Sequence, residues 1–243
     1  MNVARRKLFA VSTTALAATI TSPAPVIAAG TTDLAVSCDA AVAPAVRAAG
    51  AAFRRRSGVR IRVFPTPPGL LLPQIERQIQ NDIIVTQTRT IDQANRQSLI
   101  QLGSQTEPWR NRLVIAAAKP SAGPDGSFVV PDPSFGSDLD GTAILRHLGP
   151  SPATLIGVID TGAVAWTLAN GAARQGLLHN TEVVADPRLQ TILPVPDDAW
   201  PPILYAASIT TLARRGNPGA FIAFLASPDG QTVLQQAGLE RVA

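Results

Sequence analysis

The chain has 243 residues, of which 46% are apolar and 16% are charged, with 18 Gly and 21 Pro. This composition supports a sizeable core in one or two domains and excludes a disordered or fibrous protein. The formal net charge is +4, but Arg5, Arg6 and Lys7 lie in a segment that we expect to be removed, which leaves 18 basic against 17 acidic residues. A surplus that small excludes the strongly basic class of nucleic-acid-binding proteins.

Cysteine and histidine usage argues against metal and catalytic chemistry. The single cysteine, Cys38, excludes an internal disulfide, and no CxxC or HExxH spacing indicates zinc. One cysteine at a strand end is most often a small buried apolar residue. No GxSxG motif is present and His147 falls on the surface of a predicted helix, so a hydrolase triad is unsupported. We expect neither an enzyme nor a cofactor.

Residues 1–29 have the three parts of an export signal: a basic start, a 13-residue apolar run and a small-residue end. The apolar run is too short for a comfortable membrane span, so we expect cleavage near Ala28 or Ala29 and a periplasmic mature protein. Arg5-Arg6 resembles a twin-arginine signal but lacks the usual preceding Ser or Thr, so general secretion is an equal alternative. An N-terminal anchor that is never cut is the other interpretation.

The mature chain alternates short apolar runs, typical of buried strands, with segments whose apolar residues recur at helical spacing. We expect strands at residues 34–37, 59–64, 82–86, 111–117, 128–130, 155–159, 177–178 and 203–209. We expect helices at residues 40–56, 70–80, 142–148, 163–171, 218–226 and 230–237. The initial βαβαβ run predicts a parallel sheet with helices on both faces.

A polar, Gly/Pro-rich stretch at residues 120–127 indicates passage into a second lobe. We therefore expect one lobe from residues 33–112 together with 203–243, and a second lobe from residues 113–202.

Several local features accompany these elements. Arg54–Arg56 crowd the last turn of the first predicted helix, where the helix dipole favours cations, and Gly58 follows as a stop. Residues 65–69, PTPPG, predict a loop. Trp166 is expected in the core, and Ser227 is placed to cap the last helix.

Four segments carry a resemblance to a known family. FRRRSGVRIRVF, PQIERQIQNDIIVTQT, NRLVIAAAK and AFIAFLASPDGQTVLQQAGLERV follow one another in the order and spacing of the periplasmic molybdate-binding protein family. The resemblance covers almost the whole mature chain. It implies an α/β, type II periplasmic binding protein with two lobes, mixed sheets and a ligand cleft between them. It also implies the solute-binding protein of an ABC-type uptake system, with a small-molecule or ion ligand, a membrane permease as partner, no nucleic acid, and a monomeric state.

The resemblance also places the ligand-binding positions. The family holds a tetrahedral oxyanion through two Ser side chains, backbone amides and a Tyr hydroxyl. Carried over by spacing, the first Ser falls at Ala41, the second within residues 66–69, and the Tyr at His179. The implied ligand-binding residues are Asp39, Ala41, Thr66, Gly69, Ser137, Asp160, Thr161 and His179.

This set departs from the family pattern in charge. The Ser donors and the phenol are replaced, and Asp39, Asp138 and Asp160 are expected close to the cleft, where a carboxylate repels an anion by a few kcal/mol. Two ligand classes are compatible with this set. One is a molybdate-like oxyanion held by Thr, Ser and backbone amides, and the other is a cation or polar organic solute. His179 could donate to an anion, bind a metal, or be bonded to its neighbours alone. A periplasmic accessory protein that has lost or changed ligand binding is the competing function.

Overall fold

The structure is a computed structural model that describes residues 33–67, 69–79, 81–135, 137–149, 151–214 and 216–242. The predicted export signal of residues 1–29 lies outside the described residues. All described residues belong to one compact unit. Within this part of the chain, no helix has the length and apolar character needed to cross a membrane.

A six-stranded mixed sheet is built from both ends of the described chain. Its strand order is β11-β4-β10-β3-β1-β2. The strands are β1 (Leu34–Asp39), β2 (Ile61–Thr66), β3 (Ile83–Gln87), β4 (Trp109–Asn111), β10 (Leu204–Ile209) and β11 (Leu239–Arg241). β1 pairs in parallel with β2 and β3, whereas β10 and β4 add antiparallel pairs. The carboxyl ends of β1 and β3 therefore lie at the same edge of the sheet.

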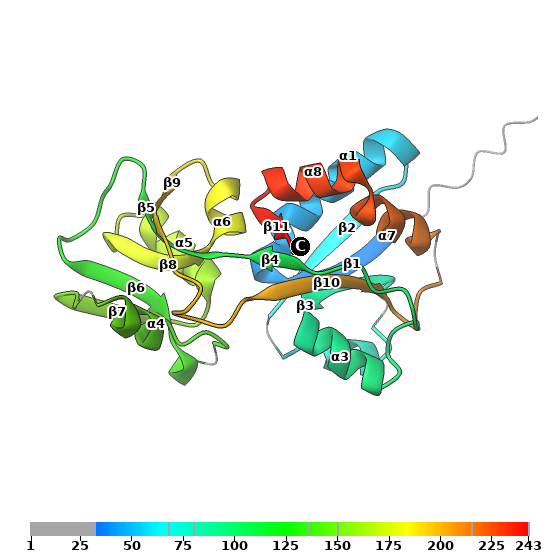
Figure 1. Ribbon diagram of the computed structural model, residues 1–243, viewed down its shortest axis with the longest axis horizontal. Helices are drawn as coiled ribbons and strands as arrows, with labels where there is room; N and C mark the ends of the chain where they lie inside the picture. The colour runs from blue at the N-terminus through cyan, green and yellow to red at the C-terminus, as the bar shows by residue number, and fades with distance from the viewer. Residues whose placement is uncertain are drawn as a thin grey trace, which may run out of the picture. The chain divides into compact units, whose positions relative to one another are not determined.

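Helices cover both faces of this sheet, because its central strands are apolar on both sides. The covering elements are the 3₁₀ turn η1 (Ala40–Val42), α1 (Ala43–Ser57), α2 (Leu71–Glu76), α3 (Thr88–Arg96), α7 (Pro218–Ala226) and α8 (Pro228–Gln236). Ile83 and Val85 of β3 pack in the core beneath α1 and α7, whereas Ile84 between them packs with α2 and α3. Figure 1 shows α1 with α8 on one side of the sheet and α3 on the other.

A five-stranded sheet has the order β7-β6-β8-β5-β9. Its strands are β5 (Leu113–Ala118), β6 (Ser127–Pro131), β7 (Thr154–Val158), β8 (Gln175–His179) and β9 (Leu189–Pro194). The 3₁₀ turn η2 (Pro133–Phe135) and the helices α4 (Gly141–Leu148), α5 (Thr161–Ala169) and α6 (Asn180–Ala185) accompany them. Phe128 and Val130 of β6 pack with α4, whereas Val129 packs with α5 on the opposite face.

The described chain passes between the sheets twice, from β4 to β5 and from β9 to β10 (Figure 1). The first passage occurs at Arg112 alone, so the predicted strand at residues 111–117 is wrong as one element: Asn111 pairs in one sheet and Leu113 in the other. The strands of the two sheets come from residues 34–111 with 204–241, and from residues 113–194. The lobe boundaries given above stay a prediction.

Other differences have local causes. The helix expected to reach residue 80 ends at Glu76, because Gln78 takes a left-handed conformation with φ of 57°. Pro65 belongs to β2 rather than to a loop; β2 is an edge strand, where a residue without an N–H is tolerated. Trp166 is 68% exposed, so its expected place in the core is wrong. Helices α3 and α6 and strands β9 and β11 were absent from the predicted elements, whereas the Ser227 cap is confirmed by its bond from the Gly230 amide.

Candidate functional site

A small cavity lies where the carboxyl ends of β1, β3 and β8 meet the start of α5. Its volume is about 40 Å³, enough for an ion or a few non-hydrogen atoms. We name it the cleft cavity, and it is lined by Asp39, Ala40, Ala41, Gln87, Ser137, Asp138, Leu139, Asp160, Thr161, His179 and Tyr205. Residues from both sheets thus face one space.

The structure brings six of the eight residues expected at the ligand together in the cleft cavity: Asp39, Ala41, Ser137, Asp160, Thr161 and His179. Gly69 instead lines an adjoining cavity of about 520 Å³, which shares Asp39, Gln87 and Asp138 with the first. We name this second space the outer cavity. Thr66 lines neither space, since its buried hydroxyl donates to the Phe64 carbonyl at 3.3 Å.

Asp39 ends β1 and presents a carboxylate to both cavities. It accepts hydrogen bonds from the Thr86 hydroxyl at 2.9 and 3.0 Å and from the Gln87 amide at 3.3 Å. Burial nevertheless dominates and raises the pKa of Asp39 to about 6, above its ordinary value of 3.8. Among the described residues, no Arg, Lys or His nitrogen lies within 4.0 Å of this carboxylate. At neutral pH a half-buried negative charge therefore faces the cavity without a direct counter-ion.

His179 ends β8 and is held from one side. Its Nδ1 lies 3.3 Å from the Thr161 hydroxyl oxygen and 3.4 Å from Oε2 of Glu182. The Thr161 hydroxyl donates its own proton to Oε1 of Glu182 at 2.8 Å, so both neighbours of Nδ1 act as acceptors. The ring also caps α6, where it accepts from the Glu182 backbone N–H, so the polar partners on the Nδ1 side include a donor as well as acceptors. That Nε2 is buried and has no hydrogen-bond partner in the described part of the protein.

Asp160 occupies the start of α5. Its side chain accepts from the Ala163 amide at 2.8 Å and so satisfies a helix N-terminal donor that would otherwise face a ligand. Ser137 differs, because its hydroxyl oxygen accepts from the Leu139 amide at 3.1 Å and its proton is left to donate. The wall thus presents a carboxylate at Asp160 and a hydroxyl donor at Ser137.

Asp138 joins the two sides of the cleft. It accepts from Nε2 of Gln87 at 2.8 Å and from Nη2 of Arg89 at 2.8 Å, across from β3 and α3. Asp138 and Gln87 line both cavities, so this bridge lies where the cleft cavity and the outer cavity adjoin. A second, buried connection joins the two sides of the cleft. The Thr181 hydroxyl donates to the Ala41 carbonyl and accepts from Nδ2 of Asn111 at 2.9 Å.

Residue-level reasoning missed three contributors: Gln87, Glu182 and Tyr205. Tyr205 is the single tyrosine of the chain, and it lies opposite Gln87 in the β10/β3 pair. Burial, followed by the nearby charge of Asp39, raises the pKa of Tyr205 well above 10.0 and keeps the phenol neutral. Gln87 could have been anticipated, because ligands bind at the carboxyl ends of parallel strands.

Other chemically interesting residues serve the scaffold. Asp82 accepts from the Ala35 amide at 2.8 Å and takes no part in the cleft cavity. Burial raises the pKa of Cys38 to about 12, so its thiol is inert. Arg112 pairs with Asp197 and Glu240 away from the cavity. Among the described residues, no group of three or more His, Cys, Asp or Glu is placed to hold a metal ion.

Comparison with known protein families identifies the family of this chain. The model of the bacterial extracellular solute-binding protein family matches residues 34–240. The chain belongs to this family. Comparison with curated protein sequences gave no significant match.

Solved structures share the fold at low identity. The periplasmic molybdate-binding protein of Azotobacter vinelandii is 18% identical with a TM-score of 0.71, over 87% of this chain and 100% of that one. Iron-bound HitA of Pseudomonas aeruginosa is 14% identical with a TM-score of 0.56, over 83% of each chain. The tungstate-binding protein TupA of Desulfovibrio alaskensis is 14% identical with a TM-score of 0.53, over 86% of this chain and 98% of that one. These likenesses confirm the predicted periplasmic binding protein fold.

Proposed function

We propose that this protein is the exported solute-binding component of an ABC-type uptake system. It acts as a periplasmic monomer that holds a small solute in the cleft cavity and presents it to a membrane permease. One observation carries the proposal: the unpartnered Nε2 of His179 and the uncompensated carboxylate of Asp39 line the same cavity. A buried nitrogen without a hydrogen-bond partner and a desolvated charge without a counter-ion both cost free energy, and a bound solute that supplies them removes that cost.

The wall favours a solute that donates hydrogen bonds and carries positive charge, such as a small protonated amine. Asp39 is ionised above about pH 6, and the unpartnered Nε2 of His179 lines the same cavity. A dianion at this position would meet the Asp39 charge at close range, at a cost of a few kcal/mol.

A tetrahedral oxyanion is the second candidate, because relatives of this fold are molybdate- and tungstate-binding proteins. The Ser137 hydroxyl would donate to it, and so would Nε2 of His179 in the tautomer that carries its proton there, and Asp39 would have to be protonated. Oxyanion binding is therefore expected below about pH 6 and lost above it.

Binding is coupled to closure of the cleft. A solute that touches Asp39 and His179 at once binds the closed arrangement better than an open one, and so shifts the population toward closure. The Gln87–Asp138 and Arg89–Asp138 bonds close the cavity over the solute.

Thermal-shift titration of the full-length gene product, purified after export, tests the proposal. The panel contains alkylamines and amino acids, divalent and trivalent cations, and molybdate, tungstate and phosphate, at about pH 5 and about pH 8. We expect stabilisation by amine-bearing solutes at the higher pH, and its loss in Asp39→Asn but not in the exposed control Asp92→Asn. Stabilisation by molybdate at both pH values would contradict the ligand class. If no solute acts on the protein, the accessory-protein function replaces the proposed one.

A further inference from the structure

A third hollow, distinct from the cleft cavity and the outer cavity, lies on the surface formed by α1 and the edge strand β2. Its volume is about 720 Å³, within the range of small-molecule sites. We name it the arginine pocket, and it is lined by Arg47, Gly50, Ala51, Arg54, Arg55, Arg60, Ile61, Arg62, Val63 and Phe64. Half of these residues are arginines and none is acidic.

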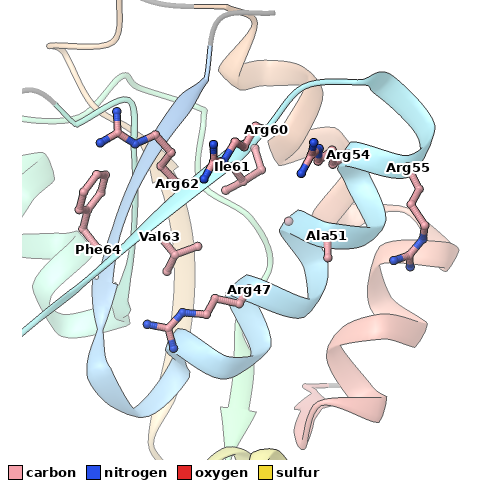
Figure 2. A pocket seen from close by; sticks show the side chains of 10 residues that line it. Arg47, Ala51, Arg54, Arg55, Arg60, Ile61, Arg62, Val63 and Phe64 are labelled. Atoms are coloured by element: carbon pink, nitrogen blue, oxygen red, sulfur yellow. The ribbon is translucent and has the colours of Figure 1, made fainter.

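The pocket follows from the spacing of arginines on two neighbouring elements. Arg47 and Arg54 are seven residues apart on α1 and share one helix face, and Arg60 and Arg62 alternate along the chain that enters and forms β2. Gly50 lets the two elements approach closely, because a Cβ there would lie 2.9 Å from Cβ of Ile61. Figure 2 shows Arg47 and Arg54 leaving α1 on the side of β2.

These guanidinium groups have no internal counter-charge. None of the five pocket arginines lies within 4.0 Å of a carboxylate in the described parts of the chain, whereas the neighbouring Arg56 pairs with Asp229. The helix dipole accounts for the positive charge of the last turn of α1, which includes Arg54. It does not account for Arg47, Arg60 or Arg62.

We propose that the arginine pocket binds a phosphoryl-bearing anion. A phosphoryl group carries up to two negative charges and three acceptor oxygens, and planar guanidinium forks on two elements can share it through paired hydrogen bonds. Arg62 is already oriented, since its guanidinium lies 5.2 Å from the ring centroid of Phe64. The phosphoryl group belongs either to a soluble oligophosphate or to the headgroup of an anionic phospholipid at the membrane surface.

Calorimetric titration of the full-length gene product with inorganic pyrophosphate tests the first source. Co-sedimentation with phosphatidylcholine vesicles, with and without phosphatidylglycerol, tests the second. The site variant is the triple substitution Arg54→Gln, Arg60→Gln and Arg62→Gln. The matched control removes three exposed arginines elsewhere: Arg77→Gln, Arg96→Gln and Arg146→Gln.

We expect the site variant to weaken pyrophosphate or anionic-vesicle binding about tenfold or more, while the control variant stays within about twofold. Binding should also fall steeply between about 50 mM and about 200 mM salt. Pyrophosphate binding without vesicle binding assigns a soluble ligand, and the reverse assigns a lipid. Three results overturn the proposal: no binding of either probe, equal loss in both variants, or citrate binding as tight as that of pyrophosphate.

Discussion

Asp39 gives the sharpest test of the cleft, because its buried charge should destabilise the ligand-free protein in a pH-dependent way. Its pKa is about 6 in the folded protein and 3.8 in an exposed chain, mainly because of burial. The folded state therefore holds the proton more tightly than the unfolded state between these pH values. The stability that this group contributes is complete below about pH 3.8 and is lost as the pH rises through about 6.

The magnitude follows from the pKa difference of about two pH units, which corresponds to about 3 kcal/mol. Asp39→Asn keeps the shape and removes the charge. We expect its free energy of unfolding, relative to wild type, to rise by about 2 kcal/mol between about pH 4 and about pH 7.5, since part of the full difference has already developed at pH 4. Urea denaturation of the ligand-free protein across this range measures the difference.

Asp92→Asn, on the exposed face of α3, is the control and should show no such trend. A stability difference between Asp39→Asn and wild type that is the same at both pH values would refute the reasoning. So would a difference that falls as the pH rises. Either result would mean that the Asp39 carboxylate is solvated or compensated in the folded protein.

Three further substitutions examine other parts of the site and scaffold. His179→Gln should weaken solute binding about tenfold or more in calorimetry, because Nε2 faces the cavity without an internal partner, and should lower stability by about 1 kcal/mol, because the contacts of Nδ1 with Thr161 and Glu182 are lost. Asp138→Asn should weaken the same binding several-fold but lower stability by about 1 kcal/mol or less, since its Arg89 partner is exposed; unchanged affinity would show that the bridge does not contribute to closure. Gly230→Ala should destabilise by about 2 to 3 kcal/mol or more in urea denaturation, because its Cβ would overlap the Phe224 carbonyl oxygen.

Elements with strong local signals could be predicted from the sequence, and elements defined by distant partners could not. The helix at residues 218–226 has the predicted bounds, because proline starts it and Ser227 ends it. Residues 111–117 are predicted as one apolar strand, yet the chain changes sheets at Arg112. Nothing local to that run specifies which sheet each half joins, since pairing partners lie about 70 to 130 residues away.

Some residues of the candidate site could likewise be predicted from the sequence, and others could not. Asp39 and His179 could be placed because strand ends and family spacing are linear features of the chain. The bond from Gln87 to Asp138 and the pairing of Tyr205 with β3 depend on how distant strands meet, so no spacing in the sequence reveals them.

The charge arithmetic takes on a different meaning once the residues are placed in space. A net charge near zero is compatible with one acidic and one basic region on the same protein, and the described chain has a region of each sign. Acidic side chains gather around the cleft cavity, whereas arginines without carboxylate partners in the described chain gather over α1 and β2. Because Asp39 and Asp160 are only partly exposed whereas the pocket arginines are exposed, salt screens the second field more than the first. Net charge excludes a polyanion-binding protein only when the basic residues are dispersed, and here five of them line one hollow.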